Sequence, residues 1–147
     1  MKKEKKKIDI SIKNREAYFN YYITDKVIAG IMLEGSEIKS LITGQVNINQ
    51  SYITIHDNRV VIKNMYIKNI QNNAFSHTET RDRVLLLTKQ QIKKWEKELK
   101  VRGTSIMCLS LFYDGKRFKM EIGIGTGKKN YDKRETIKQR DISRENN

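Results

Sequence analysis

Alternation of hydrophobic and polar residues along several stretches of the chain predicts half-buried β-strands. The clearest example surrounds Asp114-Gly115, a dipeptide typical of tight turns, which is flanked by residues 104–113 and 116–124. In the second of these runs every second residue is apolar, so one face of the strand is expected to lie in the core. Residues 51–70 contain two further β-rich runs about a polar Asp57-Asn58 turn. Both segments are therefore interpreted as antiparallel hairpins.

Other segments add strands and helices to this pattern. Aromatic and β-branched residues predict an extended strand over residues 17–33, and a short apolar run predicts another over 84–87. Apolar residues at helical spacing predict a short helix over 36–44, with Ser36 as its N-cap and a glycine at its end. A T-x-x-Q capping box opens a second helix over residues 88–103.

These elements favour a mainly β fold with helices. The strands, about six in number, fall in antiparallel hairpins without strand–helix–strand alternation, so a parallel sheet is not expected. A closed antiparallel β-barrel of the OB-like type removes exposed strand edges and is the favoured architecture. A chain of 147 residues is expected to form one domain. Residues 1–13 are interpreted as a basic flexible arm, 14–127 as the barrel and 128–147 as a basic tail.

Charge narrows the class of partner. The chain carries 30 Lys and Arg residues against 17 Asp and Glu, a net charge of +13. Five of these excess charges fall within residues 1–15 and three within 128–147. A surface of this kind repels itself without an anionic partner, so nucleic acid or an anionic membrane is expected. No apolar run reaches the roughly 20 residues that span a bilayer and no signal-peptide pattern is present, so the predicted location is cytoplasmic, with no membrane partner.

Motifs for catalysis or metal binding are weak. The run Gly123-x-Gly125-x-Gly127-Lys128-Lys129 is not a Walker A loop, because Lys129 stands where a hydroxyl residue is required. Its small residues either end a strand or let an RNA phosphate approach. His56, His77 and the single Cys108 have no metal-site spacing, so neither a metal nor a cofactor is predicted. The prediction is a protein without enzyme activity, and RNA hydrolysis is the enzyme alternative.

Basic residues beside aromatic ones carry more information. Arg15 precedes the tyrosines of residues 18–22, and Lys128-Lys129 precede Tyr131. Lys and Arg neutralise phosphates, while a tyrosine ring stacks on an unpaired base, so the combination favours RNA binding. For the first tyrosines, packing in the core is an equal alternative. The tail up to Arg144 has few apolar residues and is interpreted either as a segment that folds on RNA or as a plain solvated tail.

Several motifs, spread in order over nearly the whole chain, are shared with a known family. They are Asn14-Arg15 with Ala17, Ala29-Gly30, Gly35-Ser36-Glu37-Ile38-Lys39-Ser40-Leu41, Gly44, Asn47, Ser51-Tyr52, Leu85-Leu86-Leu87 and Gly127-Lys128-Lys129-x-Tyr131-Asp132-Lys133-Arg134. The last motif is the most specific. In these residues the chain resembles the SmpB family, the SsrA-binding proteins that accompany transfer-messenger RNA in bacterial trans-translation.

The resemblance implies a barrel that grips the tRNA-like domain of transfer-messenger RNA and a tail that enters the small-subunit decoding region of a stalled bacterial ribosome. It implies an adaptor for peptide tagging and ribosome rescue, a monomer on its RNA. The implied RNA-binding residues are Asn14, Arg15, Lys39, Gly127, Lys128 and Lys129. The implied ribosome-binding tail residues are Tyr131, Asp132, Lys133, Arg134, Lys138 and Arg140. The alternative is a structural ribosomal protein or a general OB-fold RNA-binding protein.

Three residues depart from the family pattern. Ile28 replaces the acid that usually precedes Ala-Gly, which weakens the expectation of an RNA contact there. Tyr131 replaces a frequent histidine, so a stacking ring is kept and a titratable group is absent. Ile142 replaces the usual tail tryptophan, which predicts weaker docking of the distal tail. The tail, residues 128–147, is nonetheless expected to become helical on the ribosome.

Overall fold

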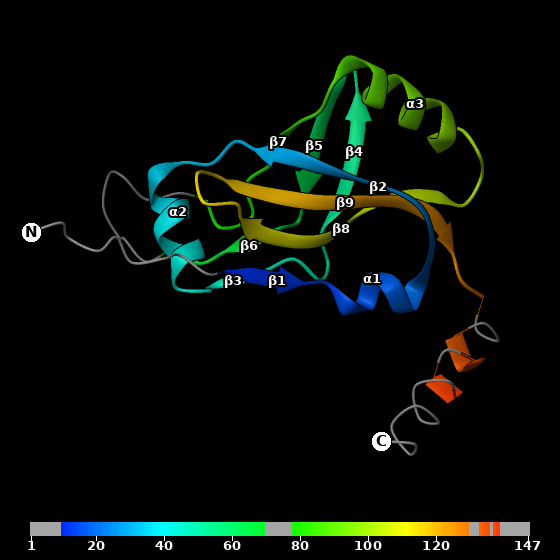
Figure 1. Cartoon of the computed structure of the whole chain (residues 1–147), viewed down its shortest axis with the longest axis horizontal. Coiled ribbons are helices and arrows are strands. Elements are labelled where there is room, and N and C mark those ends of the chain that lie inside the picture. The colour runs from blue at the N-terminus through cyan, green and yellow to red at the C-terminus, as the bar shows by residue number, and fades with distance from the viewer. Residues whose placement is uncertain (1–9, 70–77, 130–132, 136, 139–147) are drawn as a thin grey trace, which may run out of the picture.

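The computed structural model describes residues 10–69, 78–129, 133–135 and 137–138. Its elements, in chain order, are β1 (Ser11–Lys13), α1 (Arg15–Asn20), β2 (Tyr21–Ile31), α2 (Gly35–Ile42), β3 (Val46–Asn47), β4 (Tyr52–His56), β5 (Arg59–Lys63), β6 (Tyr66–Ile67), β7 (Arg83–Leu86), α3 (Lys89–Leu99), β8 (Thr104–Tyr113) and β9 (Phe118–Gly127). Figure 1 shows the strands at the centre, with α2 at one end, α3 on the upper side and α1 on the lower side. The predicted mainly β fold with helices is confirmed.

Six antiparallel strands close into a ring. Hydrogen-bonded neighbours follow the order β8-β4-β5-β7-β2-β9, and β9 pairs again with β8. β1 pairs with β8 outside the ring, and β3 pairs with β6 as a separate two-stranded sheet. Closure gives each of the six strands a neighbour on both sides and so removes free strand edges. The predicted closure of about six antiparallel strands is therefore present.

Both predicted hairpins are present. In the β8–β9 hairpin the Asp114 carboxylate accepts hydrogen bonds from the backbone N–H groups of Lys116 and Arg117, at 2.9 and 2.8 Å. In the β4–β5 hairpin Asp57 and Asn58 have φ angles of 51° and 60°, in the left-handed region. Asp and Asn tolerate this region better than most other residues with a side chain. Turn residues therefore determine both hairpins locally.

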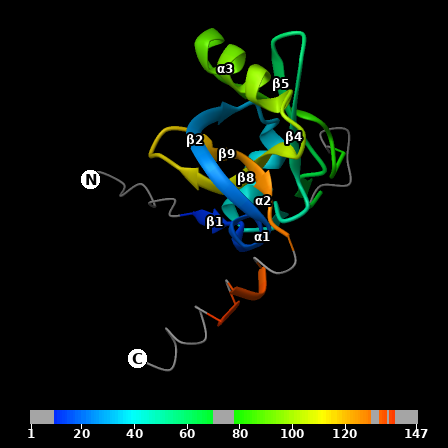
Figure 2. The same cartoon turned by 90° about the vertical axis from the view of Figure 1, so that its right-hand side faces the viewer.

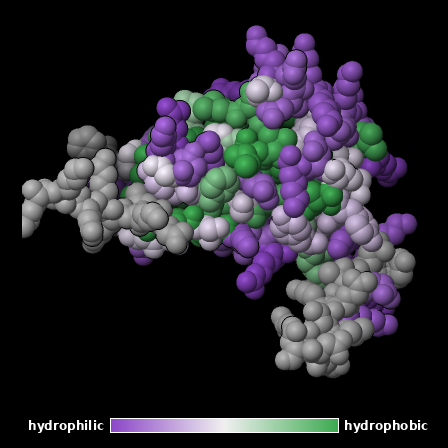
Figure 3. All heavy atoms as spheres, viewed as in Figure 1, coloured by the Kyte–Doolittle hydropathy of each residue, from purple (hydrophilic) through white to green (hydrophobic). Residues whose placement is uncertain are grey.

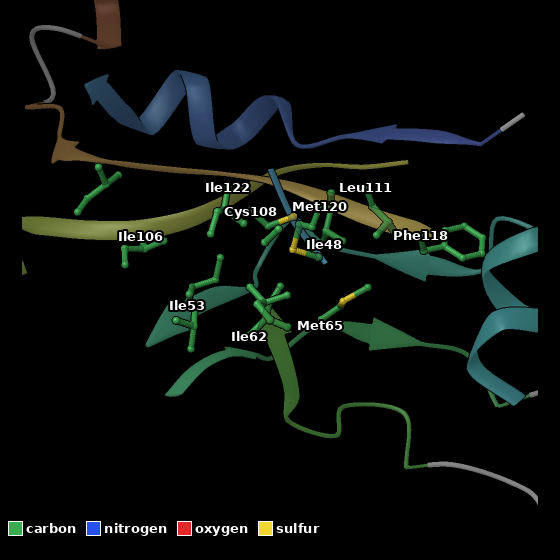
Figure 4. Close-up of a cluster of buried hydrophobic side chains, with 14 of the residues drawn as sticks. Ile48, Ile53, Ile62, Met65, Ile106, Cys108, Leu111, Phe118, Met120 and Ile122 are labelled. Atoms are coloured by element: carbon green, nitrogen blue, oxygen red, sulfur yellow. The ribbon is translucent and has the colours of Figure 1, made fainter. Parts of the chain in front are cut away.

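Aliphatic side chains fill the inside of the ring. Figure 4 shows Ile53, Ile62, Ile106 and Met120 in one cluster that draws on β4, β5, β8 and β9. Each of these four is at most 4% exposed. Cys108 lies in the same cluster, as a reduced thiol that packs like a small apolar group, and burial raises its pKa. The inner faces of the strands thus form a single core.

α3 begins at the predicted capping box. The Thr88 hydroxyl accepts a hydrogen bond from the Gln91 backbone N–H at 3.2 Å, and the Gln91 side chain accepts one from the Thr88 backbone N–H at 3.1 Å. Ile92 and Trp95 are buried against the ring. The Trp95 indole N–H donates a hydrogen bond to the Asp25 carboxylate at 2.9 Å. The helix is therefore attached to β2 as well as to the core.

The strand predicted over residues 17–33 is wrong at its start, where α1 precedes β2. The cause is an N-cap: the Asn14 side-chain oxygen accepts a hydrogen bond from the Ala17 backbone N–H at 3.3 Å. This local bond outweighs the β propensity of the aromatic residues that follow. β2 then pairs with β9 along most of its length, with a bulge between Ile23 and Asp25.

The predicted N-cap of α2 is also wrong. α2 begins at Gly35, so Ser36 lies within its first turn and the cap is Glu34. The Glu37 carboxylate accepts a hydrogen bond from the Glu34 backbone N–H at 2.9 Å. A glutamate three residues after the cap performs this role in a capping box, and it competes well with a serine that is one residue too late.

The last residues of the predicted basic arm take part in strand pairing. Residues 11–13 form β1, in which Ile12 pairs with Leu111 of β8. The backbone of β8 offers hydrogen-bonding groups on this side, and Ile12 packs against the main core. Residues 1–9 of the predicted arm lie outside the described residues.

Candidate nucleic-acid interface

α1 and the end of β9 meet at one place on the ring, which we call the α1–β9 junction. The junction comprises Arg15, Tyr18, Asn20, Tyr22, Gly127, Lys128 and Lys129. The Lys128 backbone N–H donates a hydrogen bond to the Asn20 carbonyl oxygen at 2.8 Å. Figure 2 shows α1 beside the end of β9, with the described tail residues leading away from them. The fold thus brings together basic residues from opposite ends of the sequence.

The glycines that lead into the junction differ in the space around them. A Cβ atom at Gly125 would lie 2.0 Å from the Tyr22 carbonyl oxygen, and one at Gly123 would lie 2.8 Å from the Leu109 side chain. These two glycines therefore allow β2, β8 and β9 to approach closely, and the G-x-G pattern needs no phosphate to explain it. At Gly127 the nearest atom to an added Cβ is 4.0 Å away. Packing among the described residues therefore does not require glycine at this last position.

Two tyrosines of the junction are exposed and lie beside lysines. The Lys128 ammonium lies 5.0 Å from the centre of the Tyr22 ring, and the Lys26 ammonium lies 5.1 Å from that of Tyr18. Tyr18 and Tyr22 are 43% and 48% exposed. Neither ring is therefore a core residue, and both pair with cations in the way that aromatic faces favour. The arrangement presents flat rings and positive charges on the same surface.

The Asn14 side chain, which the resemblance assigns to RNA, is directed into the protein. Asn14 is 2% exposed, and its amide donates hydrogen bonds to the carbonyl oxygens of Cys108 at 2.9 Å and Ile48 at 3.4 Å. Together with its bond to Ala17, these contacts fix the start of α1 on β8. Arg15, the next residue, is exposed on the first turn of α1.

Lys39 is exposed in the last turn of α2. α2 lies at the end of the ring opposite the junction, as Figure 1 shows. The predicted RNA-binding residues are thus divided, with Lys39 apart from Arg15, Lys128 and Lys129.

The tail is described only in part. Residues 133–135 and 137–138 are helical, and the Lys133 backbone N–H donates a hydrogen bond to the Lys129 carbonyl oxygen at 3.2 Å. Arg134 and Lys138 are exposed. The other predicted tail residues lie outside the described residues: Tyr131, Asp132, Arg140 and Ile142.

A polar hollow of about 290 Å³ adjoins the junction, between α1, the segment before β4 and β8. Glu16, Asn20, Asn49, Gln50 and Ser105 contribute to its lining. Amide, hydroxyl and carboxylate groups can form hydrogen bonds with a base edge or a ribose hydroxyl. No sequence motif indicates this hollow, because its walls come from three segments far apart in the chain.

A buried ion-pair network under α2 is also absent from the sequence-based predictions. Glu37 is fully buried and forms ion pairs with Arg83, which is also fully buried, and with Arg81. Arg83 donates further hydrogen bonds to the carbonyl oxygens of Met65 at 2.7 Å and Arg81 at 2.9 Å. The network attaches α2 to β7. The sequence does contain a signal for it, because Arg83 directly precedes the apolar run that predicts a strand.

The network holds Glu37 in its charged form. Burial alone raises the pKa of a carboxyl group, but the hydrogen bonds from Arg81, the backbone and Arg83 outweigh burial, so the pKa of Glu37 is lowered. Burial lowers the pKa of Arg83, but a guanidinium stays protonated in proteins, so the pair remains ionic.

The described ranges offer no membrane-spanning helix and no metal site. None of their helices is long and apolar enough to cross a membrane. The same part of the chain contains no group of three or more His, Cys, Asp or Glu side chains that could hold a metal ion.

A closed antiparallel ring with exposed basic and aromatic residues at one junction is the architecture of a small nucleic-acid-binding protein. Comparison with known proteins agrees with this class and narrows it. The sequence model of the family described as SmpB protein matches residues 11–147. The chain belongs to the SmpB family.

Individual relatives are similar to this chain over most of their length. The SsrA-binding protein of Orientia tsutsugamushi (strain Boryong) is 42% identical over 134 residues, which cover 90% of this chain and 88% of that protein. The SsrA-binding protein of Oenococcus oeni is 42% identical over 146 residues, which cover 99% and 94%. A chain in a solved structure described as "tmRNA-SmpB: a journey to the center of the bacterial ribosome" is similar with a TM-score of 0.67 and 27% identity, over 86% of this chain and 94% of that one.

Proposed function

We propose that this protein is an RNA-binding adaptor of trans-translation. It binds the tRNA-like domain of transfer-messenger RNA and helps to deliver it to stalled ribosomes for peptide tagging and ribosome rescue. The observation that carries the proposal is the family match over residues 11–147, because it includes the tail as well as the ring. The names of the relatives and the tmRNA–SmpB ribosome structure support the same role.

In this role the body up to residue 127 binds the RNA and the tail enters the decoding region of the small subunit. The exposed side chains of Arg15 and Lys129 and the half-buried Lys128 neutralise phosphates. The rings of Tyr18 and Tyr22 are placed for stacking on unpaired bases. Asn14 acts indirectly by holding α1. The protein itself catalyses no reaction in this role.

The remaining residues divide between two contacts. Lys39, at the far end of the ring, would contact a separate part of the RNA from the junction. The tail becomes fully helical only in the ribosomal groove, where contacts with phosphates supplement the few apolar side chains of the segment. The tail residues proposed to make these contacts are Tyr131, Asp132, Lys133, Arg134, Lys138 and Arg140.

A pair of variants tests this division of labour. Changing Asp132, Lys133 and Arg134 together to alanine is expected to abolish peptide tagging on stalled ribosomes while affinity for the tRNA-like domain stays nearly unchanged. Changing Arg15 and Lys128 together to glutamine is expected to weaken RNA binding. Loss of RNA binding in the tail variant would contradict the separation of body and tail.

The specificity of the wild-type chain tests the function as a whole. We expect it to prefer the tRNA-like domain over an unrelated hairpin RNA of equal length, with log affinity falling by roughly 0.7 to 0.9 per neutralised phosphate for each unit of log salt. Equal affinity for both RNAs would favour a general OB-fold RNA-binding protein. Stoichiometric presence on every ribosome, and not on stalled ones alone, would favour a structural ribosomal protein.

A further inference from the structure

α3 has a second charged surface that the proposed function does not use. Its inner side buries Ile92 and Trp95, and its outer side carries lysines spaced by four, four and three residues. This α3 lysine stripe consists of Lys89, Lys93, Lys97 and Lys100, all exposed. Such spacing places side chains on one side of a helix. Figure 3 shows hydrophilic side chains gathered over α3.

The lysines of the α3 lysine stripe have no ion-pair partner within the described part of the chain. Among the described residues, no carboxylate lies within 4.0 Å of their four ammonium groups, although other surface lysines, such as Lys94 and Lys119, have such partners. Like charges four residues apart destabilise a helix. α3 is instead held by its capping box, by Trp95 and by the bond to Asp25. The exposed Glu96 lies on the same side of α3, three residues after Lys93 and four before Lys100, so this side keeps a net charge of +3 that is available to an external anion.

α3 is attached to β2, whose outer face leads toward the α1–β9 junction. Tyr22 and Lys26 lie on the outer face of β2, and Asp25, between them and α3, accepts hydrogen bonds from Trp95 at 2.9 Å and Lys94 at 3.4 Å. Lys26 is thus next to the attachment point of α3. A ligand that covers the outside of β2 from Tyr22 onward would reach the helix.

The chemistry of the stripe suits phosphates and not bases. The only aromatic residue of α3 is Trp95, which is 1% exposed, so the helix presents no ring for stacking. From Lys89 to Lys100 the stripe extends about 16 Å, enough to follow several phosphates of one strand. A line of ammonium groups without base contacts recognises the backbone of a helical nucleic acid independently of its sequence.

We infer that the α3 lysine stripe binds the phosphate backbone of a double-helical segment of the same transfer-messenger RNA that the junction binds. This inference rests on the proposed function. Figures 1 and 2 place α3 on the side of the ring opposite α1 and the described tail residues. A groove that receives the tail therefore lies away from α3, whereas an RNA that covers β2 reaches both the junction and the stripe.

The test compares two full-length variants with the same reduction in charge. The stripe variant is Lys93→Gln, Lys97→Gln and Lys100→Gln; the control variant is Lys13→Gln, Arg59→Gln and Lys116→Gln, at exposed positions spread over β1, β5 and the β8–β9 turn. Affinity for the tRNA-like domain of transfer-messenger RNA is measured over a series of KCl concentrations. Glutamine has a helix propensity close to that of lysine, so α3 is expected to stay folded, which thermal unfolding checks.

The stripe variant is expected to bind with a salt slope that is shallower by about 0.9 for each phosphate that is no longer neutralised. Suppose that each of the three lysines neutralises one phosphate. The ratio of wild-type affinity to variant affinity is then about 40 times smaller at 200 mM salt than at 50 mM salt. The control variant is expected to keep the wild-type slope. The three single variants, each with a slope reduced by about 0.9, replace the triple variant if it unfolds.

Two results would overturn the inference, and a third would overturn the proposed function on which it rests. A stripe variant with the wild-type slope, or with no greater fall in affinity than the control variant, would overturn it. So would a stripe variant that binds the RNA normally but has reduced affinity for ribosomes free of transfer-messenger RNA, because the stripe would then contact ribosomal RNA. A wild-type chain with no preference for the tRNA-like domain over an unrelated hairpin would instead overturn the proposed function itself.

Discussion

The two ends of the ring use basic side chains in opposite ways. At the α2 end Arg83 is fully buried against Glu37, and Arg81 joins the same carboxylate. At the α1–β9 junction Arg15 and Lys129 are exposed, and Lys128 lies over an exposed tyrosine ring. Arginines therefore hold α2 in place from below, whereas the basic residues at the junction, like Lys39 on the surface of α2, are not used to attach an element.

The difference follows from where a carboxylate lies. A buried guanidinium loses its hydration and is tolerated only when a charged partner and further hydrogen bonds replace the missing water. Glu37 and the carbonyl groups around Arg83 provide this replacement. At the junction Arg15 and Lys129 are exposed, so their charged groups lie in water, which they can exchange for phosphate. Net charge alone does not reveal which arginines and lysines are available to RNA.

The largest effect on stability is expected at the α2 end. Glu37→Gln leaves the guanidinium of Arg83 buried without its charged partner, which costs about 3–5 kcal/mol of unfolding free energy. Urea unfolding measures this loss. Glu34→Gln is the matched control, because Glu34 is exposed and its contact with Arg81 is long, at 3.7 Å. A loss below about 1 kcal/mol in Glu37→Gln, the range of exposed pairs, would show that the network is not structural.

A smaller loss of unfolding free energy is expected where β9 enters the junction. In Gly125→Ala the added methyl group would meet the Tyr22 carbonyl oxygen 2.0 Å away, and the shift of β2 or β9 needed to relieve this contact costs about 2–3 kcal/mol. Gly127→Ala has 4.0 Å of space and is expected to stay within about 0.5 kcal/mol of the wild type. Equal unfolding midpoints for the two variants would mean that close strand approach does not explain the glycine pattern.

Acid should weaken the α2 end selectively. Because the pKa of Glu37 is lower in the folded than in the unfolded chain, its stabilising contribution is complete above the unfolded value of about 4.3 and disappears as the pH falls through the folded pKa. Wild-type stability should therefore fall more steeply below that pH than the stability of Glu37→Gln, which lacks this titration. Unfolding curves at pH 7, 4.5 and 3 compare the two. Parallel pH profiles would contradict a lowered pKa at Glu37.

The smallest effect on stability is expected at the junction. Arg15→Gln combined with Lys128→Gln should change the unfolding free energy by about 0.5 kcal/mol or less, since Arg15 is exposed and Lys128, although half-buried, lies over a ring that is itself exposed. The same variant should bind RNA more weakly, with a salt slope shallower by about 0.7–0.9 for each phosphate that is no longer neutralised. Thermal unfolding and RNA titration, performed on one sample, separate the two effects. A marked drop in stability would place these residues with Arg83, as parts of the internal structure.

Local chemistry makes part of the fold predictable from sequence. Asp57, Asn58 and Asp114 supply turn conformations within two or three residues, and the capping box at Thr88 acts within one helical turn. The residue pattern does not predict α1, because its cap, Asn14, lies just before a run of residues, 17–33, that favours a strand. Since one side-chain hydrogen bond decides that helix, average propensity over the run predicts the wrong element.

The candidate site is predictable only in part. The basic and aromatic residues of the junction stand in recognisable motifs, but their sequence does not show whether a side chain faces solvent. Asn14 matches the family motif and is nevertheless buried, while Tyr18 and Tyr22, with an equal chance of being core residues, are exposed. The direction of each side chain depends on strand register and on the packing of α1 against β8.

The sequence by itself determined the turns, the capping box of α3, the excess of positive charge and the membership of the family, because each depends on neighbouring residues or on composition. Tertiary structure decided which charges are internal and which are available, since Glu37 and Arg83 are 46 residues apart and meet only after α2 docks on β7. It also brought Arg15 and Lys128 to one junction, because strand pairing between β2 and β9 places the end of the body beside its beginning.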